Sequence, residues 1–377
     1  DSGYFSINKI TCKVSISETR AELKKLMNNG CQNYLNLNLV KLYHGVVRKS
    51  KIEEVKKIEK KGKELVWDLT ENETHSFIGN GFVIKNCGEV LLYPFESCNL
   101  GSINVWEYLK KNGGKKPHFD WQGLERDIKI ATRFLDNVVD INKYPLPEIE
   151  EISLNTRKLG LGVMGVADLL YELEISYASK QCLEFMERLM EFINYHAKSV
   201  SVELSKERGR MPYFDKSFYK EGKLPFAGFK DRKSWHFDWN EIAKKIKKFG
   251  IRNSFNTVIA PTGSISMIAG CSSGIEPVFS LVFEKSVAIG NFYYVDPVFE
   301  EAMRKAGLMD EDLIKDAATM NGSVKNIPYI PQNVKKIFVT AMDISPMDHV
   351  RVLAAFQKWT DSSISKTNNF PFDASVD

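Results

Sequence analysis

The stretch "THSFIGNGFVIKNCGEV", residues 74–90, joins two parts of the chain that differ in character. Before it, short runs rich in β-branched and aromatic residues alternate with Gly, Asn and charged turns, a pattern typical of short strands. After it, long segments with apolar residues at helical spacing alternate with short apolar runs, which indicates an α/β arrangement. The sequence therefore predicts a β-rich segment that ends at Asn86 and an α/β segment that begins at Cys87.

The composition describes an ordinary folded protein. The chain has 377 residues, of which 43% are hydrophobic and 27% charged, with a net charge of +4. Two or three domains are expected at this length, and the near-neutral charge gives no general argument for nucleic-acid binding. No apolar run reaches the roughly 20 residues that span a bilayer, so we expect a cytoplasmic protein without membrane contact. Both ends read as interrupted elements, and we expect the protein to continue beyond them.

The cysteines and histidines do not form a metal-binding pattern. Six cysteines occur without a Cys-x-x-Cys pair, and six histidines without a His-Glu-x-x-His motif, so no metal site is expected. In a reducing compartment, a functional cysteine is expected to be catalytic or redox-active. Cys182 lies in an amphipathic pattern and Cys271 follows a Gly, and we expect both to be buried or neutral thiols.

Two long helices are predicted downstream of Cys87. Residues 120–141 carry apolar side chains at helical spacing, and residues 179–209 continue such a pattern up to Gly209, a typical helix stop. In the first helix the expected apolar face consists of Leu124, Ile128, Ala131, Leu135 and Val138. Upstream, residues 17–30 are expected to form one helix among strands that include "HSFIG" and "GFVIK".

The Asn86-Cys87 pair can carry self-cleavage chemistry. An Asn side-chain amide can attack its own backbone carbonyl, and the proton transfers this needs suit a nearby His. A Cys that follows can act as a nucleophile toward an ester or thioester. The segment "ELVWDLTENETHSFIGNGFVIKNC" (64–87) resembles the C-terminal end of an intein. That resemblance implies that Asn86 cyclises, that Cys87 begins the downstream extein, and that His75 and Asp68 assist.

The resemblance also implies a domain organisation. Residues 41–86 are expected to form the C-terminal splicing segment of an intein, with a β-rich Hint-type fold. Lys85 stands where inteins usually carry His, so cleavage is expected to be slower. Residues 1–40 resemble, more weakly, a remnant of a LAGLIDADG homing endonuclease, and a plain strand-helix insertion is the alternative. No opening nucleophile of an intein is recognisable, so an intein start and an N-terminal extein are expected as separate partners.

The segment "CGEVLLYPFESCNLGSINV" (87–105) places a thiol, a carboxylate and a second thiol close together. In an extended chain, residues two apart face the same way, so Cys87 and Glu89 can address one substrate. The string resembles the catalytic segment of ribonucleotide reductases, and the agreement covers residues 87–377 in order. This implies about half of a ten-stranded α/β barrel. The further matching strings are "TRKLGLGVMGVADLL", "IAPTGSISMIAGCSSGIEPVF", "VDPVFEEAM" and "VRVLAAFQKWTDSSISKTNNFPFDAS".

The resemblance assigns roles to these residues. Cys87, as a thiyl radical, is expected to abstract the ribose 3'-hydrogen, and Glu89 to accept the 3'-hydroxyl proton. Cys98 is expected to be one of two cysteines that become oxidised to a disulfide, with its partner in the N-terminal half. A Gly-containing turn rich in N–H groups and hydroxyls suits a phosphate, and the family binds substrate phosphates there. These candidates are Pro261, Thr262, Gly263, Ser264, Ile265 and Ser266.

The motif sequences most resemble those of the adenosylcobalamin-dependent reductases, in which the cofactor generates the radical within one polypeptide. That class implies a ribonucleoside di- or triphosphate substrate, an external thioredoxin-like dithiol and a homo-oligomer. One alternative is a large subunit that uses a separate metal-radical subunit, because similar wording occurs there. An alternative of another kind is an autoprocessing intein fragment with an inactive passenger.

Overall fold

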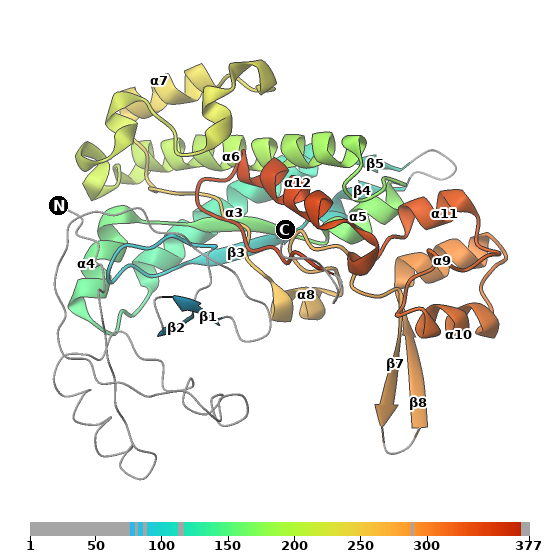
Figure 1. The fold of residues 1–377 in the computed structure, drawn as a ribbon. Coiled ribbons are helices and arrows are strands. Elements are labelled where there is room, and N and C mark those ends of the chain that lie inside the picture. The colour runs from blue at the N-terminus through green and yellow to red at the C-terminus, as the bar shows by residue number, and fades with distance from the viewer. Residues whose placement is uncertain (1–75, 80–81, 86–88, 112–116, 288–289, 371–377) are drawn as a thin grey trace, which may run out of the picture. The chain divides into compact units, whose positions relative to one another are not determined.

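The computed structural model describes residues 76–79, 82–85, 89–111, 117–287 and 290–370 (Figure 1). They belong to two compact units: Ser76–Lys85 falls in the first, and the described residues from Glu89 onward fall in the second. The helix and strands expected before residue 75 lie outside the described residues.

The first unit contributes one described element, an antiparallel hairpin. Strand β1 (Ser76–Gly79) pairs with strand β2 (Phe82–Lys85), with Ser76 opposite Lys85 and Gly79 opposite Phe82. The intervening dipeptide is Asn-Gly, the sequence that two-residue hairpin loops favour. The two strands expected from "HSFIG" and "GFVIK" are therefore confirmed.

The second unit is built on parallel backbone pairing. Strand β3 (Leu100–Asn104) pairs in parallel with β6 (Gly160–Met164). Parallel bridges then join Leu161 to Thr257 and Ile259 to Ile364, so four chain segments lie side by side. Within the described residues this sheet is open and does not close into a barrel, so the expected half barrel is seen as neighbouring parallel segments alone.

Helices connect these parallel segments and cover them (Figure 1). The connection from β3 to β6 contains α3 (Trp121–Ile141) and α4 (Pro147–Thr156), as the crossover between parallel strands requires. The next connection contains α5 (Val166–Glu172), α6 (Lys180–Arg208) and α7 (Trp239–Phe249). The remaining helices are α8 (Gly263–Ala269), α9 (Pro297–Lys305), α10 (Glu311–Thr319), α11 (Gln332–Ile337) and α12 (Pro346–Gln357).

Short elements complete the second unit. The 3-10 turns are Val105–Tyr108, Pro212–Lys216, Phe218–Glu221, Ala227–Lys230, Arg232–Ser234 and Ala341–Asp343. Strands β4 (Leu109–Lys110) and β5 (His118–Phe119) form one antiparallel pair, and β7 (Val282–Val287) and β8 (Gly290–Val295) form another. In Figure 1 the β7–β8 hairpin extends away from α9 and α10.

The two long helices begin and end where their sequences indicate. Asp120 and Ser179 cap α3 and α6, because their side chains accept hydrogen bonds from N–H groups in the first turns. Gly209 follows the last residue of α6. On α3 the expected apolar face is confirmed at Leu124, Ile128 and Leu135, which are buried. Near the end of the helix, Val139 is buried in place of the expected Val138. A helix turn has 3.6 residues, so Val139, four positions after Leu135, lies on the same face as Leu135.

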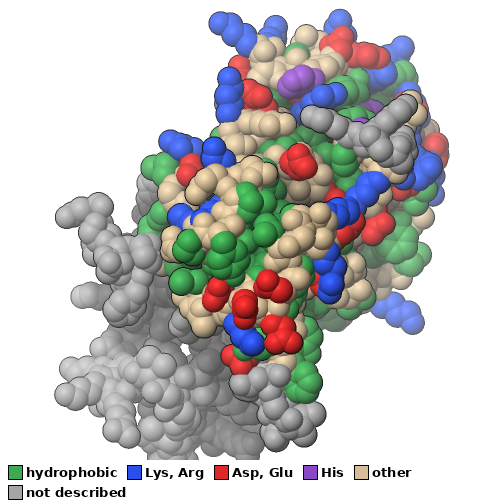
Figure 2. Space-filling model, turned by 90° about the vertical axis from the view of Figure 1, so that its right-hand side faces the viewer, with side chains coloured by type: hydrophobic (Ala, Val, Ile, Leu, Met, Phe, Trp, Pro, Cys, Tyr) green, Lys and Arg blue, Asp and Glu red, His purple; other side chains and the backbone are tan. Residues whose placement is uncertain are grey.

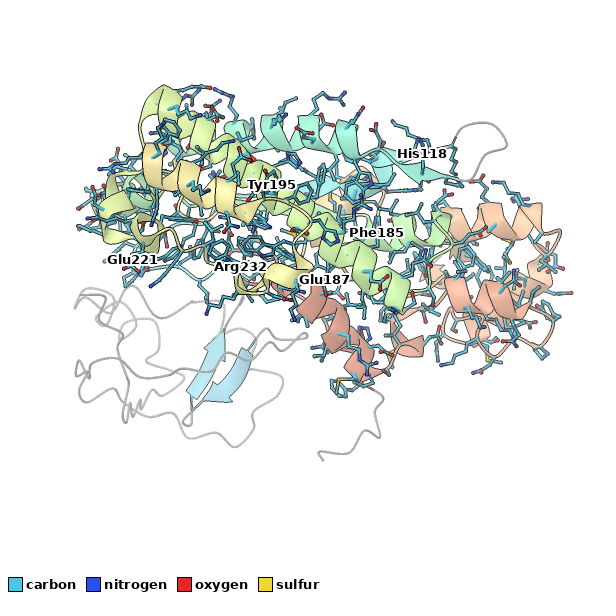
Figure 3. All side chains as sticks on the ribbon, turned by 90° about the horizontal axis from the view of Figure 1, so that it is seen from above. His118, Phe185, Glu187, Tyr195, Glu221 and Arg232 are labelled. Atoms are coloured by element: carbon cyan, nitrogen blue, oxygen red, sulfur yellow. The ribbon has the colours of Figure 1, made fainter. Side chains whose placement is uncertain are left out.

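The core is apolar and rich in aromatic side chains. From α6, Phe185 meets Phe119 edge-on with ring centroids 5.7 Å apart, and Tyr195 stacks on Phe237 at 4.6 Å. Figure 3 labels Phe185 and Tyr195 on this helix. Hydrophobic side chains also gather on the surface, as Figure 2 shows for one face. In the described part of the chain, no helix combines the length and the apolar character that crossing a membrane requires.

A wholly buried ion pair ties α6 to the sheet. Lys198 Nζ lies 2.7 Å from Asp361 Oδ2, and neither side chain has exposed surface. Asp361 also accepts hydrogen bonds from the Asn194 side chain and the Asn256 N–H group. Burial lowers the pKa of Lys198, and the charge of Asp361 opposes that shift. The pair is thus the polar link between a long helix and two neighbouring parallel segments.

We predict that Lys198→Met lowers the free energy of unfolding by about 3–5 kcal/mol, because it leaves the Asp361 carboxylate buried without its cation. The matched control is Lys245→Met, which removes an exposed pair with Glu241 on α7 and is expected to cost less than about 1 kcal/mol. Urea denaturation followed by circular dichroism measures both. Equal losses of unfolding free energy for the two variants would contradict a stabilising role of the Lys198–Asp361 pair.

Candidate functional site

The segment 89–99 carries two of the candidate residues and crosses the parallel sheet. The Glu89 carbonyl accepts a hydrogen bond of 3.2 Å from the Ser363 N–H group, and the Ser363 carbonyl accepts one of 3.3 Å from Ile259 N–H. At its other end, the Asn99 carbonyl accepts from Gly160 N–H at 2.9 Å. The segment is therefore hydrogen-bonded to two of the four parallel segments, and the buried Glu89 is linked through Ser363 to the strand segment that precedes the candidate phosphate loop.

A buried ion pair joins the middle of this segment to Lys158, just before β6. Lys158 Nζ lies 2.6 Å from Glu96 Oε2, and the two side chains are 6% and 0% exposed. Lys158 also donates to the Leu91 carbonyl at 2.7 Å. Glu96 accepts further hydrogen bonds from Tyr93 N–H at 2.9 Å and from Thr156 Oγ1 at 2.6 Å. Burial lowers the pKa of Lys158, and its contact with Glu96 opposes the shift.

Two aromatic rings enclose the same ammonium group. Lys158 Nζ lies 5.3 Å from the centre of the Tyr93 ring and 5.0 Å from that of Phe255. Both distances lie within the range of cation–π attraction. We call Glu96, Lys158 and the contacts of their charged groups the clamp. It joins the segment 89–99 to the residues just before β6.

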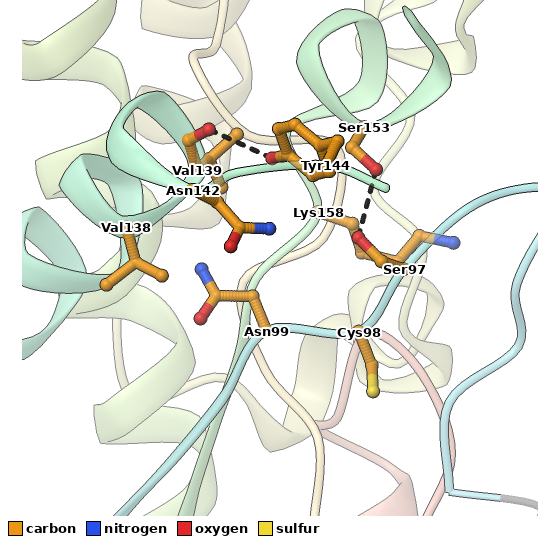
Figure 4. Close-up of a pocket in the computed structure, with 9 residues that line it drawn as sticks. All are labelled: Ser97, Cys98, Asn99, Val138, Val139, Asn142, Tyr144, Ser153 and Lys158. Atoms are coloured by element: carbon orange, nitrogen blue, oxygen red, sulfur yellow. Dashed lines mark hydrogen bonds between the residues drawn. The ribbon is translucent and has the colours of Figure 1, made fainter. Parts of the chain in front are cut away.

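Cys98 is exposed and lines a small polar cavity of about 160 Å³ (Figure 4). The Ser97 and Ser153 hydroxyls meet across its wall at 3.0 Å, and the Tyr144 hydroxyl donates to the Val139 carbonyl at 2.9 Å. The other lining residues are Asn99, Val138, Asn142 and Lys158. The Cys98 thiol is therefore accessible and has polar surroundings.

The other two described thiols are held neutral. Burial raises the pKa of Cys182 to about 12 and that of Cys271 to about 11. At neutral pH both remain protonated, and a protonated thiol is a poor nucleophile. The expectation that these residues are buried or neutral thiols is confirmed.

The candidate phosphate loop follows the strand segment 257–259, but it is only partly a turn. Thr262 adopts a left-handed conformation with φ of 56°, and its Oγ1 accepts from Gly274 N–H at 2.6 Å. Helix α8 begins at Gly263, and Ser266 N–H donates to the Thr262 carbonyl as in a helix. The tight turn expected through Ser266 is thus wrong for its second half, because a helical hydrogen bond forms at once.

The start of α8 presents unused donors. The N–H groups of Gly263, Ser264 and Ile265 lie in the first helical turn, where no carbonyl of the same helix can accept from them. These three residues are exposed, as is Pro261. The Ser266 hydroxyl is buried and lies 2.8 Å from the Ser273 hydroxyl. Of the six candidates, those at 263–265 can therefore meet an anion most directly.

A second polar cluster supports the loop after α8. Lys366 Nζ donates to Glu276 Oε2 at 2.7 Å and lies 3.1 Å from His349 Nδ1. The Thr367 N–H group donates to Glu276 Oε1 at 2.6 Å. These contacts hold the end of the fourth parallel segment against the loop that follows the phosphate candidates.

The sequence reasoning missed both the clamp and this second cluster. The available signal was a charged residue that borders or interrupts an otherwise uncharged run, as for Lys158 in "TRKLGLG" and Glu276 in "SSGIEP". The structure places Glu89, Cys98 and residues 261–266, whereas Asp68, His75, Asn86 and Cys87 lie outside the described residues. Lys85, which the intein resemblance would place next to last, ends β2. Within the described residues, no group of three His, Cys, Asp or Glu could hold a metal ion.

Comparison with known proteins gives a consistent picture. Residues 44–377 match the family model "Ribonucleotide reductase, barrel domain". A vitamin B12-dependent ribonucleoside-diphosphate reductase from Thermoplasma acidophilum is 44% identical over 290 residues, which are 76% of this chain and 34% of that protein. One from Mycobacterium tuberculosis is 35% identical over 369 residues, or 97% of this chain and 49% of that protein.

A further relative carries a different name. The ribonucleoside-diphosphate reductase subunit alpha of Chlamydia pneumoniae is 34% identical over 373 residues, which cover 89% of this chain and 35% of that protein. This chain spans between a third and a half of the length of these curated relatives.

We predict that, in the native protein at pH 8, iodoacetamide labels Cys98 at least about tenfold faster than Cys182 or Cys271, because less than about one in a hundred of the latter thiols is ionised. Peptide mass spectrometry after timed labelling measures the three rates. The urea-unfolded chain serves as the control, in which the rates should converge. Rapid native labelling of Cys182 would contradict its burial.

Proposed function

The chain belongs to the ribonucleotide reductase barrel-domain family, and from this premise we propose that it forms part of the catalytic barrel of an enzyme that makes deoxyribonucleotides. The observation that carries the proposal is the double connection through Ser363. One hydrogen bond joins it to Glu89, and a second joins it to Ile259, two residues before the phosphate candidates begin. Glu89 therefore lies two hydrogen bonds away from the strand segment that leads into α8, the proposed anion-binding helix.

We assign the reaction to three side chains. A Cys87 thiyl radical takes the 3'-hydrogen atom of the ribose, and Glu89 accepts the 3'-hydroxyl proton. The 2'-hydroxyl then takes a proton from one of two reducing thiols and leaves as water, and Cys87 finally returns the 3'-hydrogen atom to the ribose. Cys98 and a second cysteine supply two electrons and become a disulfide, which an external thioredoxin-like dithiol reduces. The accessibility of Cys98 supports this assignment, since an exchanging thiol must be reachable.

The substrate is proposed to be a ribonucleoside diphosphate or triphosphate whose phosphates lie at residues 261–266. Support comes from the first turn of α8, because its N–H groups and the partial positive charge of a helix start favour an anion. Thr262 and Ser266 act differently, since their hydroxyls bond Gly274 and Ser273 and fix the loop.

Adenosylcobalamin is the proposed radical source, and its support lies in the names of the relatives. The cavity beside Cys98 does not fit this cofactor: its volume is about 160 Å³, whereas pockets for drug-sized ligands already span roughly 300–1,000 Å³. No described residue is assigned to hold it, and no step is derived through it. A large subunit with a separate metal-radical subunit is the second candidate, favoured by the alpha subunit of Chlamydia pneumoniae.

We also propose that the chain is made as a precursor that splices itself at Asn86/Cys87. The β1–β2 hairpin, which ends next to this pair, supports the strands that the intein resemblance implies for residues 41–86. The family match extends upstream of Cys87 to residue 44 and so overlaps that segment. We further propose that residues 1–40 are the remnant of an endonuclease. The complete enzyme is proposed to be cytoplasmic and homo-oligomeric.

We predict that, in the complete processed enzyme, Cys87→Ser abolishes ribonucleotide reduction and Glu89→Gln lowers kcat by about 10²–10⁴, the usual contribution of a general base. Conversion of radiolabelled ribonucleotide with and without adenosylcobalamin measures this. Cys271→Ser, which removes a neutral thiol outside the proposed chemistry, is the control and should retain kcat within about twofold. Activity that survives in Cys87→Ser refutes the radical site.

Self-cleavage is tested separately. Incubation of the purified chain should yield a break between Asn86 and Cys87 that mass spectrometry locates, and Asn86→Ala should abolish it, because the succinimide can no longer form. If both proteins remain intact, or both are cut alike, the splicing proposal is wrong. That outcome, together with normal reductase activity, would leave the reductase assignment unaffected.

A further inference from the structure

The segment 89–99 needs a support that ordinary packing does not provide. Between Glu89 and Asn99 it contains no helix or strand, so its backbone groups lack the partners that regular structure supplies. Apolar burial contributes little to anchoring it, since Leu91, Leu92 and Phe95 are 41–60% exposed.

The same segment also carries backbone strain. Phe95 adopts a positive φ of 65°, which is uncommon for a residue with a bulky side chain. Such a conformation persists only where surrounding contacts enforce it. Phe95 immediately precedes Glu96, the acidic residue of the clamp, so the enforcing contacts lie next to the strained residue.

The clamp supplies what the segment lacks. The Lys158 ammonium group donates a hydrogen bond to the Leu91 carbonyl, and the Glu96 carboxylate accepts one from the Tyr93 N–H group. The two charged groups also neutralise each other. Thr156 Oγ1 fixes the remaining carboxylate oxygen at 2.6 Å. A buried ion pair costs desolvation and is seldom a gain in stability by itself, so specific positioning is the better explanation for its presence.

The clamp lies between the two functional groups of the segment. Leu91 is two residues after Glu89, and Glu96 is two residues before Cys98. Lys158 also lines the cavity beside Cys98. A displacement of the clamp would therefore shift both groups, one at each end, whereas residues 261–266 belong to a different loop.

We propose that Glu96 and Lys158 are positioning residues, whose buried ion pair holds the segment 89–99 so that Glu89 and Cys98 face the same substrate. The inference rests on the proposed reductase function for its consequence in catalysis, but the clamped state of the segment is independent of that function. It predicts that loss of the pair slows chemistry and leaves substrate binding intact.

The catalytic test uses the complete processed enzyme with Lys158→Met, Glu96→Gln and the two combined. We expect kcat to fall by about tenfold to a hundredfold, the effect of a misplacement near 1 Å, with KM changed less than about twofold. The combined variant leaves no unpaired buried charge, so it should remain folded and still show the loss.

The matched control is Glu191→Gln. Glu191 is also a wholly buried carboxylate that accepts three hydrogen bonds, from His236 N–H, His236 Nδ1 and Trp239 Nε1, but it lies in α6 away from the segment. It should reduce thermal stability and leave kcat within about twofold at temperatures where the enzyme is folded. If the clamp variants behave like this control, the positioning role is refuted.

A second readout does not require activity. Chymotrypsin cuts after the exposed Leu91, Leu92 and Phe95 only if the segment opens locally. In Lys158→Met and Glu96→Gln, cleavage there should be at least about tenfold faster than in the parent or in Glu191→Gln. Unchanged cleavage overturns the clamp, whereas accelerated cleavage in an enzyme that does not reduce ribonucleotides confirms the clamp and rejects the proposed function.

Discussion

The close approach of β6 to the strand segment 257–259 is the constraint on which the site depends. A Cβ atom at Gly162 would lie 2.3 Å from the Val258 carbonyl oxygen, so no other residue fits there. This contact holds the central parallel segments together, and β3 and residue 364 pair on either side of them. Glu89, Cys98 and the start of α8 all take their positions from that sheet.

The arrangement uses polar contacts where apolar packing is absent. The helices pack on the sheet through a large apolar core. Buried ion pairs, such as Lys198 with Asp361, add individual polar links between helix and sheet. The segment 89–99 is different, because the clamp and the hydrogen bonds at its two ends fix it. Such a design keeps Cys98 accessible while its backbone stays in place, which a segment buried in the core could not do.

Local pattern explains how much of this could be foreseen. The two long helices were predictable from apolar spacing and caps, because Asp120, Ser179 and Gly209 act within a few residues of the helix ends they set. The proposed roles of Glu89 and Cys98 came from family resemblance, and the structure adds that Glu89 is buried and Cys98 exposed. Lys158 and Glu96 could not be paired from sequence, because 62 positions separate them and only the parallel sheet brings them together. The start of α8 was missed because Thr262 takes a left-handed conformation that the sequence does not reveal.

We propose that Glu89 and the start of α8 contact one nucleotide, and a crystal structure of the complete enzyme with bound ribonucleotide would show this directly. We predict a Glu89 carboxylate oxygen within about 2.6–3.2 Å of the 3'-hydroxyl, the reach of a general base. We also predict phosphate oxygens at the N–H groups of Gly263 and Ser264. A nucleotide whose phosphates bind elsewhere, or whose ribose lies out of reach of Glu89, would contradict this proposal.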